Sequence, residues 1–321
     1  MNRPYVPQPV LDAAHARSAA RAARDWVTAD RLRDEIEAAG WRVVDSGIDF
    51  NLEPAPAVEV GADGVTRYGR SAAVPSRFDE PATGLATVVL IATDQPDDLE
   101  RAVGSLRTHC PGTTQVVVVA DGPSAAQEAR FADLPDGVEV IRTTQRLGWG
   151  AALNIGIRRA TADVVVLLDT SIEPTGDLVT PLAEALREPD VAVAGPFGLR
   201  TTDLRRFDEI SDGRDAAAIG GYAIAFRRSD AVTRGPVDEG FRFYRGLDIW
   251  WSLVLRDEGP DQPPRCAVTV TGVPLLRHED RGGAGMPEAE VERLSKRNYY
   301  RVLDRFRDRL DLAVGDGSGL A

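Results

Sequence analysis

The chain has 321 residues, of which 43% are hydrophobic, so it can bury a substantial core as one large domain or two small ones. Its formal net charge of −12 argues against a broad electrostatic footprint for nucleic acid or an anionic membrane, because both need clustered Lys and Arg. No apolar run approaches the roughly 20 residues that span a bilayer, and the N-terminus lacks the apolar core of a signal peptide. The sequence therefore predicts a cytoplasmic protein with no membrane span and no nucleic-acid partner.

Residues 10–40 are predicted to form two short helices, with Thr28 as a possible N-cap of the second and Gly40 as its C-terminal stop. The stretch 16–47, ARSAARAARDWVTADRLRDEIEAAGWRVVDSG, resembles the C-terminal helical segment of cysteinyl-tRNA synthetases. This resemblance covers only a short region and implies a helical hairpin used for packing or dimer contact, with tRNA contact as the alternative. We therefore assign residues 1–50 to an N-terminal helical hairpin.

The segments on either side of the central region are less regular. Residues 51–84 are predicted to be a linker, because they repeat Pro, Gly and Ala with little periodicity, and one short strand is expected within 58–69. Residues 281–321 are predicted to contain a Gly-rich loop, which could close over substrate, and an amphipathic helix. Core packing or formation of a homodimer would explain the apolar face of that helix.

In the central region, short apolar runs alternate with amphipathic helices. Continuous Val, Leu and Ile runs indicate strands covered on both faces, so we predict an α/β fold with a mostly parallel central sheet flanked by helices. The predicted strands are 85–93, 115–120, 138–143 and 163–169, and the predicted helices are 97–110, 124–134 and 149–161. Ligands bind at the carboxyl ends of such strands, which places Thr93, Asp121 and Asp169 along one rim.

Four segments resemble family-2 glycosyltransferases and follow the order found in that family. They are VVLIATDQPDDLERAVGSL, QVVVVADGPS, RLGWGAALNIGIRRATADVVVLLDTSIEP and GGYAIAFRRSDAVTRGPVDEGFRFYRGLDIWWSLVLRDEG. The resemblance runs from Leu85 to His278 and implies a glycosyltransferase-like domain of the GT-A type over residues 85–280. It also implies inverting transfer of a sugar from a nucleoside diphosphate donor to a hydroxyl acceptor, a saccharide or another molecule.

The donor nucleotide is expected on the strand-end rim. By resemblance Thr93 and Asp121 would hold the base and ribose, although Ala120 replaces the first acid of the usual pair. Asp121 has an alternative role in an Asx turn that caps the next helix. A glycine-rich turn and helix start supply further predicted contacts to the nucleotide sugar, namely Gly148, Trp149 and Asn154. Close packing of the helix on the sheet is the alternative explanation of these small residues.

A divalent metal ion, Mg²⁺ or Mn²⁺, is implied by the strand that ends at Asp169, because a charge after an apolar run needs a partner. The family has an Asp-x-Asp motif here, whereas this chain reads Asp169-Thr170-Ser171 and so replaces an acid by a weaker hydroxyl ligand. Glu173 is expected to start the next helix. By resemblance His278 would complete the metal site, with a surface or structural histidine as the alternative.

Asp248 is the candidate catalytic base. It aligns with the second acid of the family's Glu-Asp pair, and Leu247 replaces the Glu. A carboxylate here would take the proton from the acceptor hydroxyl, and the alternative is an N-cap for the helix that follows. Of the adjacent Trp250 and Trp251, one is expected to pack in the core, and Trp251 is our candidate for stacking on a sugar ring.

Two other functions remain open. Ala120, Ser171 and Leu247 each replace an acid, which favours a catalytically degenerate protein that binds a nucleotide sugar without transferring it. The N-terminal hairpin allows a tRNA-associated protein as a third reading, which a basic face on that hairpin would support.

Overall fold

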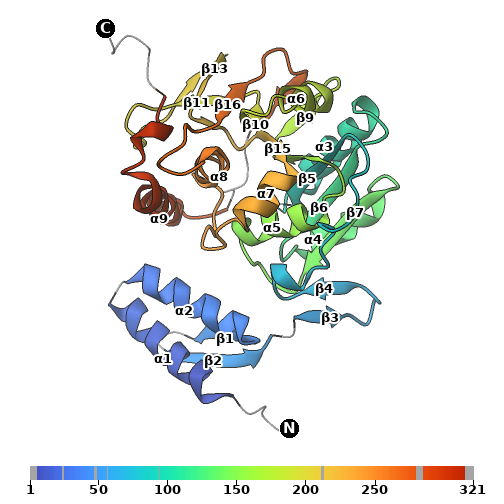
Figure 1. The fold of residues 1–321 in the computed structure, drawn as a ribbon. Coiled ribbons are helices and arrows are strands. Elements are labelled where there is room, and N and C mark those ends of the chain that lie inside the picture. The colour runs from blue at the N-terminus through green and yellow to red at the C-terminus, as the bar shows by residue number, and fades with distance from the viewer. Residues whose placement is uncertain are drawn as a thin grey trace.

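The structure is a computed structural model, and Figure 1 shows its fold. It describes residues 6–23, 25–46, 49–55, 57–92, 94–210, 213–279 and 285–314. The predicted nucleotide contact Thr93 and most of the predicted closing loop therefore lie outside the described residues.

The N-terminal residues form a small module of two helices and a β-hairpin. Its elements are α1 (Gln8–Ala22), α2 (Trp26–Ala38), β1 (Trp41–Ser46) and β2 (Asp49–Pro54). The helical hairpin is confirmed, but Asp25 and not Thr28 caps α2, because the Asp25 side chain accepts a hydrogen bond from the Thr28 amide at 3.1 Å. The antiparallel pairing of β1 with β2 was not predicted. The module has a core of its own, built around Val10, Ala14, Ile36 and Trp41.

Within the described residues a ten-stranded sheet forms the centre of the larger body, in the order β13-β16-β10-β15-β8-β5-β6-β7-β4-β3. The strands are β3 (Val58–Val60), β4 (Thr66–Tyr68), β5 (Ala86–Ala92), β6 (Gln115–Ala120), β7 (Val138–Thr143), β8 (Val164–Leu168), β10 (Val191–Gly195), β13 (Gly213–Ala216), β15 (Ala223–Arg227) and β16 (Cys266–Thr269). Strands β4, β7, β6, β5 and β8 run parallel, whereas β15 is antiparallel to both neighbours. The predicted parallel centre is thus confirmed.

The range predicted as a linker adds two strands to this sheet. Strands β3 and β4 form an antiparallel hairpin, and β4 pairs in parallel with β7. A one-strand linker is therefore too simple a description of residues 51–84. The pairing satisfies backbone N–H and C=O groups that the edge of β7 would otherwise leave without partners.

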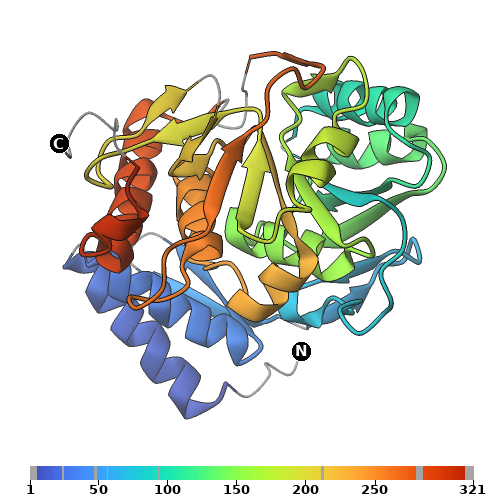
Figure 2. The same ribbon diagram turned by 45° about the horizontal axis from the view of Figure 1, so that its top comes forward.

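Helices cover both faces of the sheet (Figure 2). One face packs against α5 (Trp149–Arg159), α7 (Arg228–Arg234) and α8 (Leu247–Arg256), and the other against α3 (Pro96–His109), η2 (Phe131–Asp133) and α6 (Val179–Ala185). Val89 and Ile91 of β5 belong to the first core, while Val88 and Leu90 belong to the second. This alternation confirms that the central strands are buried on both faces. The remaining helical segments are α4 (Ala125–Arg130), η1 (Ser71–Ala73) and η3 (Leu310–Leu312).

The predicted C-terminal helix is present as α9 (Glu288–Phe306), which packs beside α8. Val302 and Phe306 are buried in the core, whereas Tyr299 and Tyr300 are exposed. Core packing therefore accounts for one side of α9, and self-association stays a prediction. Among the helices of the described residues, none is both long and apolar enough to cross a membrane.

Two small sheets complete the fold. One contains β11 (Gly198–Arg200), β12 (Asp208–Ile210) and β14 (Ala218–Ile219), and the other pairs β9 (Ile172–Pro174) with β17 (Leu275–Arg277). The prediction that Glu173 starts a helix is wrong, because it lies in β9 opposite Leu276. The pairing of β9 with β17 also brings His278 beside the turn that follows β8, where its amide donates to the Ser171 carbonyl at 2.8 Å.

Candidate active site

A cavity of about 310 Å³ opens between the C-terminal ends of β5 and β8 and the start of α8. Its floor is apolar and includes Val89, Ile91 and Leu167. Its polar and aromatic lining is made up of Trp149, Asp169, Tyr222, Tyr244, Arg245, Asp248 and Trp251. The two carboxylates predicted for donor and acceptor chemistry therefore face one cavity, at the strand ends where an α/β sheet binds its ligands.

Asp169 and Asp248 are both hydrogen-bonded to the backbone of Gly221–Tyr222, the two residues that precede β15. The Asp169 amide donates to the Tyr222 carbonyl at 2.9 Å, and the Gly221 amide donates to Asp248 Oδ2 at 2.8 Å. A Cβ on Gly221 would lie 3.2 Å from the Asp248 Cβ, so glycine permits this close approach. The backbone thus sets the distance between the two acids.

Asp248 lies in the first turn of α8, just after Gly246, which has a φ of +80°. Gly246 is the N-cap and Asp248 follows it inside the helix, so the N-cap alternative for Asp248 is wrong. Burial raises the pKa of Asp248 above its ordinary value, while hydrogen bonds from the amides of Ile249 and Gly221 oppose that shift. A carboxylate with a raised pKa is a stronger base, which suits proton abstraction.

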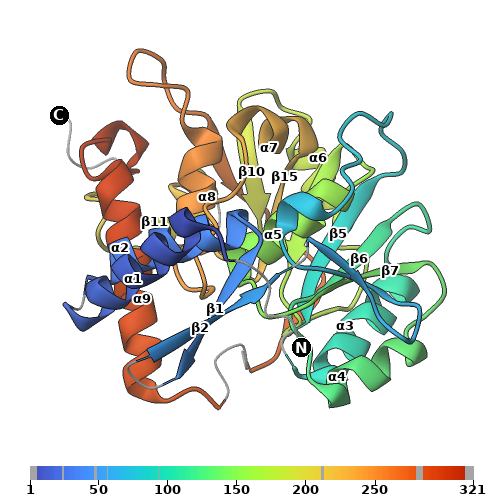
Figure 3. The same cartoon turned by 90° about the horizontal axis from the view of Figure 1, so that it is seen from below.

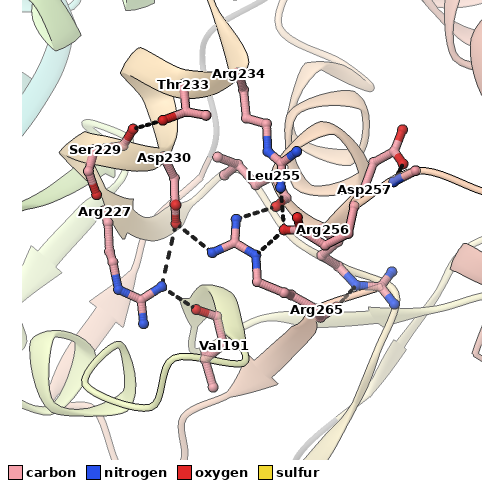
Figure 4. Close-up of polar contacts among 12 residues, drawn as sticks. Val191, Arg227, Ser229, Asp230, Thr233, Arg234, Leu255, Arg256, Asp257 and Arg265 are labelled. Atoms are coloured by element: carbon pink, nitrogen blue, oxygen red, sulfur yellow. Dashed lines mark hydrogen bonds and ion pairs between the residues drawn. The ribbon is translucent and has the colours of Figure 1, made fainter. Parts of the chain in front are cut away.

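The C-terminal half of α8 is fixed by a network of arginines and acids (Figure 4). Asp230 of α7 accepts from Arg265 at 2.9 Å, and Arg265 also donates to the Leu255 carbonyl at 2.7 Å. Arg256 is buried and donates to the carbonyls of Ala217 and Leu312 at 2.7 and 2.8 Å. Burial lowers the pKa of Arg256 to about 10. These bonds anchor the helix whose first turn carries Asp248.

The strand end at Asp169 has only part of a metal site. Asp169 Oδ1 accepts from the Ser171 amide at 2.8 Å, and Ser171 Oγ is buried with no hydrogen-bond partner among the described residues. The ring of His278 meets Glu173, with 2.7 Å between Nε2 and Oε2. The described residues hold no group of three or more His, Cys, Asp or Glu arranged for a metal ion. Asp169 and Ser171 are therefore the candidate oxygen ligands for a metal ion. The His278 ring is instead hydrogen-bonded to Glu173.

Asp121 lies at the end of β6, buried beneath the loop that leads into α5. Its carboxylate accepts from the amides of Leu147 at 2.7 Å and Gly148 at 2.8 Å, and from Thr143 Oγ1 at 3.1 Å. Burial raises the pKa of Asp121, although these donors oppose the shift. The Asx-turn alternative is wrong, because Ser124 caps the next helix. Asp121 does not line the cavity, and its contacts favour positioning of the loop over direct contact with a nucleotide.

Of the three residues predicted at the start of α5, only Trp149 lines the cavity. Its ring lies 5.5 Å from that of Tyr244. Asn154 bonds both backbone groups of Val237, at 2.8 and 2.9 Å, and the Glu239 carboxylate at 3.0 Å, so its amide holds a neighbouring loop. Gly148 has a φ of +100° and packs against Arg242. These contacts favour the packing alternative for Gly148 and Asn154.

Trp250 and Trp251 are both buried, with exposed fractions of 5% and 1%. Trp251 reaches the cavity from the core side and packs edge-on against Phe226. Trp251 thus lines the cavity while Trp250 packs against Phe241 in the core, and stacking of Trp251 on a sugar ring stays a prediction. Trp149, Tyr222 and Tyr244 are the half-buried aromatic residues in the lining that can present a ring to a sugar or a base.

Sequence reasoning missed Tyr222, Tyr244 and Arg245 in the cavity lining. Arg245 is exposed and its guanidinium lies 5.8 Å from the centre of the Tyr244 ring. The sequence signal that could have identified two of them is an aromatic residue and a cation, Tyr244 and Arg245, directly before the turn at Gly246. All three residues lie in the fourth segment that resembles family-2 glycosyltransferases, but the resemblance assigns them no role.

Parts of the chain are similar to known proteins. Residues 87–234 match the family model described as Glycosyl transferase family 2. The amylovoran biosynthesis glycosyltransferase AmsE of Erwinia amylovora is 33% identical over 87 residues, which is 26% of this chain and 32% of AmsE. A cysteine–tRNA ligase of Opitutus terrae is 50% identical over 50 residues, 16% of this chain and 11% of the ligase. The matches thus span a third or less of these two relatives.

Two solved structures share the fold. One is GalNAc-T7 with UDP, GalNAc and Mn²⁺, at a TM-score of 0.57 and 17% identity over 71% of this chain and 50% of that one. The other is the mannosyltransferase PcManGT of Pyrobaculum calidifontis with GDP-Man and Mn²⁺, at a TM-score of 0.50 and 17% identity over 73% and 71% of the two chains. The matched part of this chain is a family-2 glycosyltransferase domain, and its fold is of the GT-A type.

Proposed function

We propose that this chain transfers a sugar from a nucleoside diphosphate donor to a hydroxyl acceptor, with inversion at the anomeric carbon. The observation that carries the proposal is the pair of carboxylates, Asp169 and Asp248, in one cavity. The family match supports it, as do the nucleotide-bound states named for the two structural neighbours.

On the donor side, Asp169 and Ser171 would hold a divalent cation together with oxygens of the diphosphate. Ser171 Oγ is a buried oxygen without a partner among the described residues, and Asp169 is a carboxylate beside it, so both suit a hard cation. When bound, such a cation would neutralise charge that develops on the leaving diphosphate. Arg245 stands at the exposed side of the cavity, where its cation can also meet a phosphate.

On the acceptor side, Asp248 would accept the proton of the attacking hydroxyl. The hydroxyl oxygen forms a bond to the anomeric carbon while the bond from that carbon to the diphosphate breaks, and the nucleoside diphosphate leaves with the electron pair. A single displacement of this kind inverts the anomeric configuration. The raised pKa of Asp248 supports this role, because it increases the affinity of the carboxylate for the proton it receives.

A catalytically degenerate protein that binds the donor is the second candidate. Ser171 and Leu247 stand where the family resemblance places acids, and this substitution pattern favours it. Binding of the donor without turnover would identify this function.

The test is a thermal-shift screen of nucleoside diphosphates and their sugars, with and without Mn²⁺, since a ligand that binds the folded state raises its apparent stability. Ligands that stabilise the chain are then assayed for transfer, with Asp248→Asn as the matched control. Transfer by the wild type and its loss in the variant support the enzyme. Stabilisation without transfer to any acceptor favours the binding protein. If no nucleotide or nucleotide sugar stabilises the chain, both candidate functions are contradicted.

A further inference from the structure

Helix α2 of the N-terminal module directs three acids at the larger body. Asp30, Asp34 and Glu37 are spaced so that they share one side of the helix. Asp30 pairs with Arg297 of α9 at 2.6 Å, while Asp34 and Glu37 both pair with Arg242, the latter at 3.5 Å. Figure 3 shows α1 and α2 lying across α9. The module is thus docked by charge pairs rather than by a continuous apolar core.

Arg242 also holds the loop that leads into α5. Its guanidinium donates to the Leu147 carbonyl, and a Cβ on Gly148 would lie only 2.8 Å from the Arg242 Cδ. From the opposite side, the amides of Leu147 and Gly148 donate to Asp121. The loop is therefore held by the Asp121 carboxylate, at the end of a sheet strand, and by Arg242, whose charge is balanced by Asp34 and Glu37 of α2. Trp149 follows directly and lines the cavity.

A second contact joins the module to the same loop. Arg42 of β1 donates to the Gln145 side chain at 3.5 Å, and the Gln145 carbonyl accepts from Thr143 Oγ1 at 2.7 Å. The module therefore touches the loop both at Gln145, directly, and at Leu147, through Arg242.

Burial makes the Arg242 pairs matter. The side chains of Arg242 and Glu37 are only 13% and 15% exposed. If one of them is removed, water can therefore solvate the remaining charge only poorly. Loss of Glu37 would leave the mostly buried Arg242 paired only with Asp34, whose side chain is 42% exposed, and loss of Asp34 would leave it with Glu37 alone. The neighbouring acids Glu37 and Asp34 raise the pKa of Arg242 against the effect of its burial.

We propose that the N-terminal module positions one wall of the donor cavity, with Arg242 as the positioning residue between α2 and the loop of residues 145–148. Acids of α2 that do not line the cavity would then govern the affinity for the donor. The donor readout rests on the proposed function, whereas the effect on the loop does not.

The test uses the full chain with Asp34→Asn and Glu37→Gln as separate variants, so that one remains if the other folds poorly. Hydrogen exchange at the amides of Leu147 and Gly148 reports on the loop without any ligand. We expect exchange about tenfold faster or more in each variant, and a KM for the donor raised by a similar factor with kcat within about twofold.

Two controls come from the same helix. Glu35→Gln removes an exposed pair with Arg31, which does not involve Arg242, and should change neither readout. Asp30→Asn removes the pair with Arg297, which does not contact the loop, and should leave loop exchange within about twofold.

Unchanged exchange in Asp34→Asn and Glu37→Gln would overturn the proposal, as would an equal effect of Asp30→Asn, because the module would then add only general stability. Faster exchange in the first two variants, together with a wild type that binds no nucleotide sugar, would uphold the positioning role and reject the proposed function.

Discussion

Asp169 and Asp248 are bonded to the two residues of one dipeptide: the Asp169 amide donates to the Tyr222 carbonyl at 2.9 Å, and the Gly221 amide donates to Asp248 at 2.8 Å. Hydrogen bonds to the Gly221–Tyr222 backbone therefore hold both acids beside this segment, where each lines the same cavity. A donor on the Asp169 side and an acceptor on the Asp248 side would meet between them. This relationship underlies the first two predictions.

Asp248→Asn should reduce kcat by about 10² to 10⁴-fold while donor affinity stays within about twofold, because the base acts on the proton of the acceptor. The variant should be at least as stable as the wild type, since burial makes the ionised carboxylate unfavourable in the folded state. Steady-state kinetics, calorimetric titration of the donor and urea unfolding measure the three quantities. A variant that unfolds readily and loses donor binding would point to a structural role.

The pH dependence should report the raised pKa of Asp248, whose ordinary value is 3.8. We expect kcat/KM to fall as pH decreases through the raised folded-state pKa, because protonation removes the base. For stability the sign is opposite: the contribution of this group is fully present below 3.8 and is lost as pH rises through the folded-state pKa. Asp248→Asn should therefore gain most over the wild type above that pKa. Equal pH profiles of unfolding for both proteins would contradict this assignment.

Ser171→Asp should strengthen Mn²⁺ binding in the presence of a nucleoside diphosphate, because it places a carboxylate where a buried hydroxyl lacks a partner among the described residues. In the wild type, EDTA should weaken nucleotide-sugar binding, and Asp169→Asn should do the same. Calorimetric titrations with and without the chelator measure these effects. If the chelator changes the affinity of neither wild type nor Ser171→Asp, the site binds its donor without metal.

Trp149→Ala should lower donor affinity about tenfold with a small loss of stability, since its ring is half-buried and lines the cavity. Trp250→Ala is the contrasting variant, because Trp250 is buried and packs against Phe241. It should lose about 3–5 kcal/mol of unfolding free energy. Urea unfolding and donor titration of both variants separate donor contact by Trp149 from core packing by Trp250. If Trp149→Ala lost mainly stability and Trp250→Ala mainly donor affinity, the donor would bind elsewhere.

Asp121→Asn should lower the free energy of unfolding by about 1–3 kcal/mol, because an amide NH₂ would face one of the buried donors that the carboxylate accepts from. Thr143→Val is the comparison: it leaves both loop amides bonded to Asp121 and removes the hydroxyl that bonds the Gly122 amide and the Gln145 carbonyl. Chemical denaturation of the two variants measures the difference. A fully stable Asp121→Asn with reduced donor affinity would instead support the direct nucleotide contact predicted from sequence.

Local sequence determined the regular elements of this fold. Unbroken Val, Leu and Ile runs can be stable only when both faces are covered, which predicted the parallel strands β5, β6 and β8 and the helices on either side. The same reasoning located Asp169, which follows the end of an apolar strand. Asp248 was instead identified through the family resemblance, and it lies at the start of a helix after a glycine turn.

Tertiary structure alone decided which polar groups face the cavity. Asp121 and Asn154 stand at expected places in the chain, yet Asp121 bonds the loop at Leu147 and Gly148 and Asn154 bonds Val237. These partners are distant in sequence, and no periodicity encodes them. In residues 58–69 the sequence predicted one short strand, whereas two strands form a hairpin that joins the sheet. The reason is similar: the two strands are short and only partly buried, and pairing with β7 rather than their own composition holds them in the sheet. Burial makes a polar side chain bond whatever donor the fold brings to it, and only the folded chain sets that partner.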